Sequence, residues 1–243
     1  MNIITGMHRS GTSLAARLFF EAGADMGKRE TFHPPDKWNP DGYYEQPDIH
    51  AINMPLINGP WWKFAYFFLP SEKTIRNRGN KRKDLISQTS IKYDGKVVKE
   101  ARFCLTLPAW LDNGNRVNKV LICIRTPSQV AKSIQKRNFI TMNHAYYLWA
   151  VHNERILKYT ANIPTWILNY NNVLEEDSFL EEIEGSLNFF DIHLPTQQLL
   201  ELRKKFVKKE MNHHQETHQN FPEKVKNLWE ELNRRHENQY KGR

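Results

Sequence analysis

One stretch near the N-terminus decides the expected fold: Asn2-Ile3-Ile4-Thr5-Gly6-Met7-His8-Arg9-Ser10-Gly11-Thr12-Ser13-Leu14-Ala15-Ala16-Arg17-Leu18-Phe19-Phe20. Residues 2–7 form a short apolar run typical of a buried strand, and Leu14, Leu18 and Phe19 then recur at helical spacing. The turn between them has a glycine at each end and small hydroxyl residues at its exit. A strand, a glycine turn and a helix N-terminus make an anion site, because backbone N–H groups converge there and the helix dipole favours negative charge.

This turn is a variant of the phosphate loop. Gly6 to Ser13 follows the pattern G-x-x-x-x-G-K-[ST] except that Thr12 stands where the lysine should be. The basic side chain lies three places upstream, at Arg9. The simpler interpretation of the two glycines is an ordinary turn between a strand and a helix. Arg9, Ser10, Thr12 and Ser13 together in one turn favour the phosphate interpretation.

The same turn carries a family resemblance. It resembles the 5′-phosphosulfate loop of sulfotransferases that use 3′-phosphoadenosine-5′-phosphosulfate (PAPS), and the bacterial branch often has Gly-Met-His-Arg-Ser-Gly-Thr-Ser, as here. Other branches have lysine where this chain has Arg9. The resemblance implies that the nucleotide is bound by seven consecutive residues: Met7, His8, Arg9, Ser10, Gly11, Thr12 and Ser13.

The composition is that of a globular protein with an anionic partner. With 243 residues, 40% of them hydrophobic, the chain is long enough for one sizeable α/β domain and short for two. The net charge of +8 favours a nucleotide, a nucleic acid, a membrane surface or an acidic glycan as partner. Charge alone does not choose among these.

Two features bear on the compartment. Cys104 and Cys123 lie in apolar runs, without metal-ligand spacing, and are expected to be buried and reduced. The N-terminus has no basic leader, and no apolar run approaches the ~20 residues of a membrane helix. The sequence therefore predicts a cytoplasmic protein without a membrane span.

A polar loop at residues 33–45 provides candidates for a catalytic base. Residues 39–49 (Asn-Pro-Asp-Gly-Tyr-Tyr-Glu-Gln-Pro-Asp-Ile) resemble the Asn-Pro-x-Gly-Tyr-Phe-Glu stretch of bacterial sulfotransferases, which borders the acceptor site. The resemblance favours Glu45 as the base, although a solvated loop carboxylate is the simpler interpretation. Three rivals lie in the same stretch: Asp41, Asp48 and His50.

Residues 58–95 are expected to be the least regular part of the chain. An aromatic run at 61–68 is expected to be core or a lid lining, and a basic run at 73–83 to be a solvated surface. Aromatic and basic side chains together suit an acidic or aromatic acceptor. This region is therefore predicted to set acceptor choice.

A predicted strand ends at Lys99, and Arg102 follows three residues later, so both side chains can reach the same anion. Bacterial sulfotransferases often have Lys-Asp-Pro-Arg here, whereas this chain has Glu100 and Ala101 in place of aspartate and proline. The resemblance implies that Lys99 acts at the reacting sulfuryl group or the bridging oxygen.

Residues 118–124 form the clearest buried strand, since a continuous apolar run suits the centre of a parallel sheet. Phosphate-loop NTPases often end such a strand in an aspartate that helps to hold Mg²⁺, but here it ends in Arg125, which attracts an anion. A surface charge at a strand end is the simpler interpretation. Arg-x-Pro, five residues and then Ser is the 3′-phosphate motif of sulfotransferases. The resemblance implies that this phosphate is bound by Arg125 and Ser133, with Arg137 in the extended motif.

The second half of the chain is predicted to continue the alternation of helix and strand. A helix is expected at 143–160, a strand at 163–170, a helix behind a capping box formed by Ser178 and Glu181, and charged helices beyond Pro195. The family has Tyr-Glu after this strand. Here Asn171 follows Tyr170, so no catalytic role is assigned to that tyrosine.

The C-terminal part holds two weaker motifs. Lys208 and Lys209 are candidates for contact with the 3′-phosphate from a loop. His213, His214 and His218 lie in a polar stretch without a complete ligand set, so no metal site is predicted there.

These patterns predict a single α/β domain over residues 1–243, with a central, mostly parallel sheet flanked by helices. The resemblance implies a fold like that of the P-loop nucleoside triphosphate hydrolases, and metal-independent, in-line transfer of a sulfuryl group from PAPS to a hydroxyl or amine, with adenosine 3′,5′-bisphosphate as the second product. The acceptor is expected to be a small molecule or a glycan.

Two alternatives belong to other classes. An ATP-dependent small-molecule or nucleoside kinase would share the strand, loop and helix, but Thr12 and Arg125 disfavour it. A non-catalytic protein that binds anions or nucleic acid would use the basic run at 73–83, but it leaves both anion motifs unexplained. No nucleic-acid partner is therefore predicted, and a catalytically inactive relative of the sulfotransferases stays open.

Overall fold

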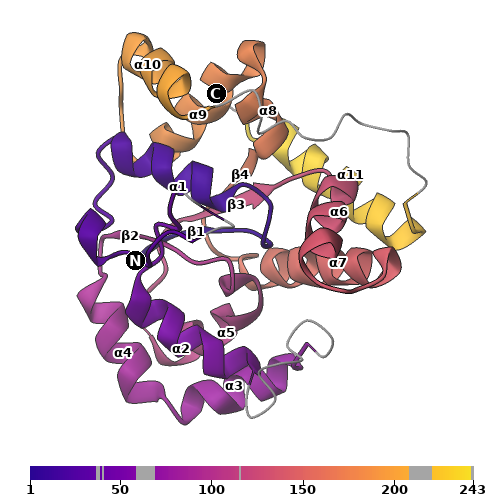
Figure 1. Cartoon of the computed structure of the whole chain (residues 1–243). Coiled ribbons are helices and arrows are strands. Elements are labelled where there is room, and N and C mark those ends of the chain that lie inside the picture. Colours follow the sequence, from indigo (N-terminus) through magenta and orange to yellow (C-terminus); the bar gives the residue numbers. More distant parts are fainter. Residues whose placement is uncertain (37–38, 40, 59–68, 115, 208–220, 242–243) are drawn as a thin grey trace.

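A four-stranded, all-parallel sheet forms the centre of the molecule in the computed structural model, which describes every residue except 37–38, 40, 59–68, 115, 208–220 and 242–243 (Figure 1). The strands lie in the order β2-β1-β3-β4. Their bounds are β1 Asn2–Thr5, β2 Val97–Lys99, β3 Val120–Ile124 and β4 Thr165–Asn169. The α/β class and the parallel sheet predicted from the sequence are confirmed.

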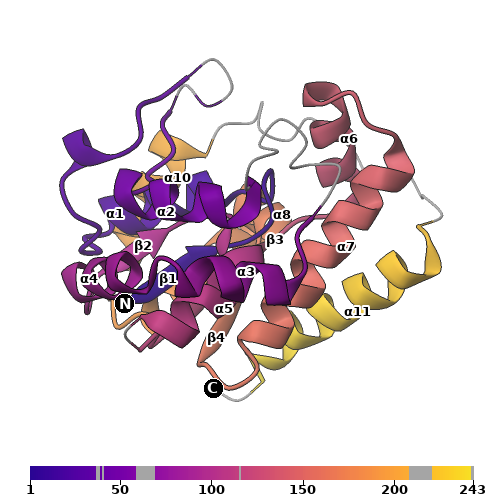
Figure 2. The ribbon, with the colours of Figure 1, turned by 90° about the horizontal axis from the view of Figure 1, so that it is seen from below.

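Helices cover both faces of this sheet (Figures 1 and 2). On one side, the helices that contribute to a first core are α2 (Pro47–Asn58), α3 (Glu72–Asn80), α4 (Lys83–Lys92), α5 (Phe103–Asn113), α6 (Pro127–Arg137), α7 (Met142–Tyr159) and α11 (Glu223–Asn238). On the other side, a second core includes α1 (Thr12–Glu21), α8 (Tyr170–Leu174), α9 (Glu176–Phe189) and α10 (Thr196–Phe206). A short 3₁₀ turn, Arg29–Thr31, lies between α1 and α2.

Side-chain alternation along the strands explains the two cores. In β3, Ile122 packs into the first core, while its neighbours Leu121 and Cys123 pack into the second. Successive side chains of a strand point to opposite faces, so a strand covered on both faces must be apolar throughout. All five residues of β3 are buried, as the continuous apolar run predicted.

Residues 69–95 are more regular than predicted. The basic run lies on α3 and the start of α4, and Arg78 donates hydrogen bonds to the carbonyls of Leu56 and Ile57, at 2.8 Å each, at the C-terminal end of α2. The prediction failed because α3 buries only Ile75 and Gly79, which is too sparse to give a helical periodicity. The aromatic run at 61–68 lies outside the described residues.

The capping box predicted at Ser178 is wrong. Helix α9 already begins at Glu176, behind Glu175 as the N-cap residue. The Ser178 hydroxyl lies within the first turns of α9 and donates to the carbonyl of Asn172 in α8, at 2.9 Å. The helix begins earlier because only Glu175 separates it from α8, so the chain has no room for a cap at Ser178.

Two glutamine side chains pair with the outer strands. The Gln239 amide, just beyond α11, accepts from the N–H of Ile167 at 2.9 Å and donates to the carbonyl of the same residue at 2.7 Å. Gln46, just before α2, accepts from the N–H of Lys99 at 3.1 Å and donates to the carbonyl of Met26 at 3.1 Å.

Among the described helices, none is long and apolar enough to cross a membrane.

Candidate active site

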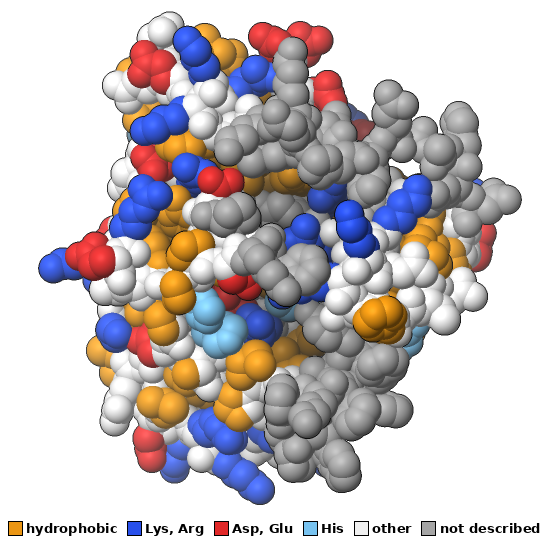
Figure 3. All heavy atoms as spheres, in the orientation of Figure 1, with side chains coloured by type: hydrophobic (Ala, Val, Ile, Leu, Met, Phe, Trp, Pro, Cys, Tyr) orange, Lys and Arg blue, Asp and Glu red, His pale blue; other side chains and the backbone are white. Residues whose placement is uncertain are grey.

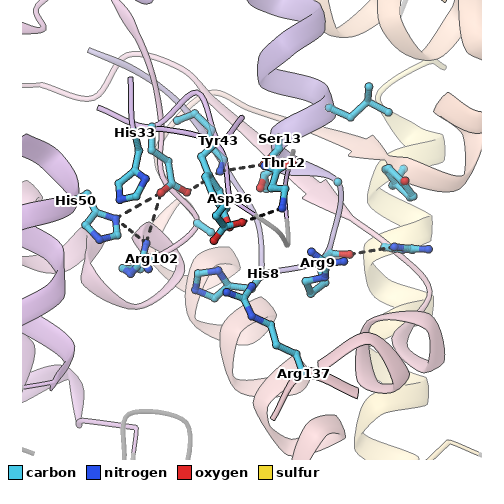
Figure 4. A pocket seen from close by; sticks show the side chains of 18 residues that line it. His8, Arg9, Thr12, Ser13, His33, Asp36, Tyr43, His50, Arg102 and Arg137 are labelled. Atoms are coloured by element: carbon cyan, nitrogen blue, oxygen red, sulfur yellow. Dashed lines mark hydrogen bonds and ion pairs between the residues drawn. The ribbon is translucent and has the colours of Figure 1, made fainter. Parts of the chain in front are cut away.

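A cavity of about 340 Å³ opens at the carboxyl ends of β1, β2 and β3, where parallel α/β sheets generally bind their ligands. Its walls come from the loop between β1 and α1, the loop before α2, the turn between β2 and α5, and helix α6. Histidine and basic side chains meet in a hollow at the centre of this face (Figure 3), and Figure 4 shows them converging on the cavity.

The loop between β1 and α1 has the conformation of an anion-binding turn. The φ angles of Gly6, Arg9 and Gly11 are 150°, 74° and 85°, so three residues adopt backbone conformations that favour glycine. A Cβ on Gly6 would lie 2.3 Å from the carbonyl oxygen of Cys123, and one on Gly11 would lie 2.0 Å from the Tyr170 ring. Both glycines are therefore required by close packing as well as by their backbone angles.

Helix α1 presents its N-terminus to the cavity. It begins at Thr12, with no side-chain cap and no acidic residue in its first turn. Thr12 and Ser13 line the cavity, and within the described part of the chain their N–H groups have no acceptor. Unpaired N–H groups and the positive end of the helix dipole together attract an anion.

The structure brings the two predicted phosphate motifs into direct contact. Nε of Arg9 donates to the Ser133 hydroxyl at 2.8 Å, across 124 residues of sequence. Nη1 of Arg125 donates to the carbonyl oxygen of Arg9 at 3.4 Å. The β1–α1 loop therefore packs directly against helix α6, although Ser133 itself does not line the cavity.

Arg125 is a buried cation without a carboxylate partner among the described residues. Its residue is 8% exposed, its Nε donates to Gln129 Oε1 at 2.7 Å, and its guanidinium lies 4.5 Å from the centre of the Tyr170 ring. Burial lowers the pKa of Arg125, but an arginine stays charged in proteins. A buried charge that is neither paired nor fully solvated is costly, so this residue is suited to binding an anionic ligand.

Arg137 lines the same cavity from the last turn of α6. Arg137 is near Tyr43. The Tyr43 hydroxyl donates to Asp36 Oδ1 at 2.7 Å. Burial and the bond to Asp36 raise the pKa of Tyr43 to about 12, and the Arg137 charge opposes this rise. Arg137 thus lies close to Tyr43 in the loop before α2.

Two of the predicted loop residues do not line the cavity. Met7 is fully buried in the first core, and its carbonyl accepts from the N–H of Ser10 at 3.1 Å, which closes the turn. Ser10 is 1% exposed. Their side chains are packed beneath the loop, whereas His8, Arg9, Gly11, Thr12 and Ser13 line the cavity.

Lys99 and Glu45 form a buried ion pair at the cavity wall. Nζ of Lys99 lies 2.7 Å from Glu45 Oε1 and donates to the Ser13 hydroxyl at 3.4 Å. Their side chains are 2% and 7% exposed. Since Gln46 accepts from the Lys99 backbone N–H, Glu45 and Gln46 hold both nitrogens of this lysine. Burial raises the pKa of Glu45, but the charge of Lys99 outweighs it and holds that pKa below its ordinary value.

The three rival bases occupy different positions. Asp41 pairs with Arg17 at 2.9 Å, and Asp48 pairs with Lys92 at 2.6 Å; neither aspartate lines the cavity. His50 does line it. Of the four candidate bases in this stretch, Glu45 and His50 lie together at the cavity.

His50 lies between two carboxylates. Its Nδ1 is 3.4 Å from Glu45 Oε2 and 3.5 Å from Glu100 Oε2. The adjacent carboxylates of Glu100 and then Glu45 raise the pKa of His50 to about 9, which favours the imidazolium at neutral pH. Arg102 Nη1 contacts Glu100 Oε1 at 2.7 Å.

These side chains also have metal-ligand spacing. One ligand atom each from Glu45, His50 and Glu100 lies within 4.8 Å of the others. However, Lys99 and Arg102 already contact the carboxylates. With His50 protonated, three cationic groups face two carboxylates, and the surplus positive charge favours an anion over a metal ion.

His8 points into the cavity near Arg9 and Arg137 (Figure 4). Burial, followed by the positive charge of Arg102, lowers the pKa of His8 well below 6.5, so its imidazole is neutral at pH 7. A neutral imidazole has one donor and one acceptor nitrogen. His8 is thus equipped for hydrogen bonding to a ligand and not for ion pairing.

The sequence analysis missed three residues of the site. Tyr170 supports Arg125, Glu100 holds Arg102 and His50, and Asn39 donates to the Ser13 hydroxyl at 3.1 Å. The position of Tyr170 directly after a parallel strand was an available signal, because such strand ends converge at one edge of the sheet. The predictions for Lys208, Lys209, His213, His214 and His218 lie outside the described residues.

Two solved structures share this architecture. One is the sulfotransferase domain from the Synechococcus PCC 7002 olefin synthase, with a TM-score of 0.55, 12% identity, and coverage of 96% of this chain and 94% of that chain. The other is the sulfotransferase domain from the curacin biosynthetic pathway, with a TM-score of 0.51, 13% identity, and coverage of 96% and 97%.

No protein-family model and no curated protein matches the sequence. The likeness to the two solved structures therefore concerns the fold. The chain has a sulfotransferase fold, which is of the P-loop nucleoside triphosphate hydrolase type, as predicted.

Proposed function

We propose that the chain, as one domain over residues 1–243, is a sulfotransferase that uses PAPS as donor and a hydroxyl or amine as acceptor. The observation that carries the proposal is the contact of Arg9 with both Ser133 and Arg125, whose buried guanidinium lacks an acidic partner among the described residues. The shared fold and the two sulfotransferase-like motifs support it.

The side chains at the cavity suit a nucleotide with two separate anionic groups. Arg125 and Ser133, with Arg137, would bind the 3′-phosphate. The N–H groups at the start of α1, with Thr12 and Arg9, would bind the 5′-phosphosulfate. The close contact of Gly11 with Tyr170 keeps the loop and the Arg125 support together, so the two anion sites keep a fixed separation.

When bound, PAPS would supply the sulfuryl group, and its 5′-phosphate would be the leaving group. Arg9, Thr12 and the loop N–H groups would stabilise the charge that grows on the leaving oxygen. Lys99 lies between Ser13 and Glu45, so its ammonium serves both the donor loop and the base.

Glu45 is the proposed base for the acceptor. Its pKa is held below the ordinary value, which makes it a weak base before the reaction. In a loose transition state the acceptor oxygen bonds to sulfur before it loses its proton, and this makes the proton strongly acidic. A weakly basic carboxylate is then sufficient: the acceptor O–H bond breaks and the proton moves to Glu45.

The two alternatives gain less from the structure. A kinase would require a metal-holding acid where β3 ends, and the residue there is Arg125. A nucleic-acid surface would use the cations of α3, but two of them have partners within the protein: Arg76 contacts Glu72 and Asp112, and Arg78 donates to carbonyls of α2. Neither alternative uses the contact between Arg9 and Ser133.

Isothermal titration calorimetry tests the donor. We expect tight, metal-free binding of adenosine 3′,5′-bisphosphate and weak binding of ATP with Mg²⁺. Arg125→Ala should weaken bisphosphate binding at least about a hundredfold, because it removes a desolvated, charge-assisted contact. Arg234→Ala is the matched control, since Arg234 is an exposed arginine that pairs with Glu231 on α11.

Three outcomes would refute the proposal. Preference for ATP with Mg²⁺ would establish the kinase. Equal losses in the Arg125 and Arg234 variants would show non-specific charge attraction. Binding of neither nucleotide would mean an inactive relative or a protein of another class.

A further inference from the structure

Glu100 is a fully buried carboxylate that the proposed reaction does not yet use. Oε1 accepts from the Arg102 N–H at 3.0 Å and contacts Arg102 Nη1 at 2.7 Å. Oε2 has no hydrogen-bond partner in the described part of the chain and lies 3.5 Å from His50 Nδ1. Because an unpaired buried carboxylate oxygen is costly, its position opposite a cationic ring indicates a function.

We propose that His50 is a positioning residue: an imidazolium shared between Glu45 and Glu100, which orients Glu45 and keeps Glu100 as its counterion when Glu45 takes up the acceptor's proton. This inference rests on the proposed function for its role in catalysis. Nδ1 lies within ion-pair distance of both carboxylates, at 3.4 Å from Glu45 and 3.5 Å from Glu100.

Proton balance explains why two carboxylates are needed. During transfer the acceptor O–H bond breaks and a new O–H bond forms on Glu45, while the proton on Nδ1 stays on His50. Glu45 then becomes neutral. Without Glu100, a partly buried imidazolium would be left beside the Arg102 guanidinium with no anion, and that repulsion would oppose the proton transfer.

The groups that face His50 come from two elements. Glu45 and His33 belong to the segment before α2, and the His33 ring lies 5.2 Å from the His50 ring. Glu100 and Arg102 belong to the turn between β2 and α5, and Arg102 Nη1 lies 3.2 Å from His50 Nδ1. The two carboxylates raise the pKa of His50, and burial and Arg102 oppose them, with a net value of about 9.

Titration of the His50 ring by NMR tests the inference without nucleotide or acceptor. The resonance of His50, one of ten histidines, is assigned by its loss in His50→Gln. We expect a wild-type midpoint of about 9. Glu100→Gln and Glu45→Gln should each lower it by about one pH unit or more, and the double variant should bring it to about 6.5 or below.

Asp48→Asn is the matched control, because it removes a carboxylate two residues from His50 that instead pairs with Lys92 and Tyr93. It should leave the midpoint nearly unchanged. Since coupling is reciprocal, the fall caused by Glu45→Gln also measures how strongly His50 stabilises the Glu45 carboxylate.

A midpoint that moves only in Glu100→Gln would show that His50 pairs with Glu100 alone, and this would overturn the inference. A midpoint that moves in neither variant would also overturn it. Unfolding curves show whether each variant is folded, and where one is not, an unmoved midpoint in the other still refutes the inference. The titration and the calorimetry test different statements. The shared imidazolium can be refuted while adenosine 3′,5′-bisphosphate still binds. If the bisphosphate does not bind but the His50 midpoint moves as expected, the proposed donor is refuted and the pairing of His50 with both carboxylates stands.

Discussion

Addition of a single methyl group, in Gly11→Ala, should disturb the proposed 3′-phosphate site by displacing the Tyr170 ring. The Cβ of Gly11→Ala would lie 2.0, 2.7 and 2.8 Å from three carbon atoms of the Tyr170 ring, whereas ordinary contacts begin near 3.4 Å. The ring must therefore move by about 1.5 Å to restore normal carbon–carbon contact. That ring supports the guanidinium of Arg125, so the displacement reaches the proposed 3′-phosphate site.

The magnitude has two parts. The left-handed backbone of Gly11, with φ of 85°, costs about 1–2 kcal/mol for a residue with a Cβ. Displacement of Tyr170 removes a cation–π contact worth about 0.5–2 kcal/mol. We expect the free energy of unfolding to fall by about 2–4 kcal/mol, and the affinity for adenosine 3′,5′-bisphosphate to fall about tenfold to thirtyfold.

Gly23→Ala is the control. Gly23 has a φ of 93° and follows the other end of α1, but a Cβ there would meet no atom within 4 Å. Gly23→Ala should lose only the stability that depends on the left-handed backbone, about 1–2 kcal/mol, and should keep its full affinity for adenosine 3′,5′-bisphosphate. Urea unfolding and calorimetry on both variants, with Gly11→Ala repeated in a Tyr170→Ala background, separate the two parts. Equal stability losses in the two single variants, with unchanged affinity, would refute the reasoning.

Three further predictions follow from the site. Glu45→Gln should lower turnover of PAPS at least about a hundredfold and leave bisphosphate binding within about twofold, with Asp41→Asn as control; retained turnover would reassign the base. Ser133→Ala should weaken bisphosphate binding about fivefold to tenfold, since Arg9 loses the hydrogen bond that orients it, and unchanged affinity would contradict this. The raised pKa of His50 gives stability that is fully present below about pH 6.5 and is lost as the pH rises through about 9; unfolding curves should show a loss of up to about 3 kcal/mol that His50→Gln abolishes.

The sequence predicted the parts of the fold that depend on local pattern. Strand β3 was identified because a strand covered on both faces has no polar position, and the start of α6 because Thr126 and Pro127 are a cap and a first helical residue. Helix α3 was missed for the opposite reason. It is a surface helix whose sequence is mostly polar, and it is held by its contacts with α5 and α2.

The nucleotide loops could be predicted because an anion site made of backbone N–H groups is contained within a few consecutive residues. The contacts of Tyr170 and Glu100 could not, because they join distant segments. Tyr170 was set aside when Asn171 broke the expected motif, yet its role comes from the position of its ring under Arg125. Glu100 differs from the aspartate of the family pattern, and the longer side chain is the one that meets His50 and Arg102.

The glutamine side chains that bind to the outer strands affect whether this sheet can pair with strands of other chains. A strand with free N–H and C=O groups along its outer side is a template for another strand, and small sheets are prone to growth by such addition. On β4, Ile167 is already paired by Gln239, and the N–H of Asn169 donates to Glu182 at 2.6 Å. On β2, the N–H groups of Val97 and Lys99 are bound by the Asp25 carbonyl and Gln46. Side-chain and backbone groups therefore already occupy these outer positions, and loss of the segment that carries Gln239 would expose Ile167 of β4 to pairing with a second copy.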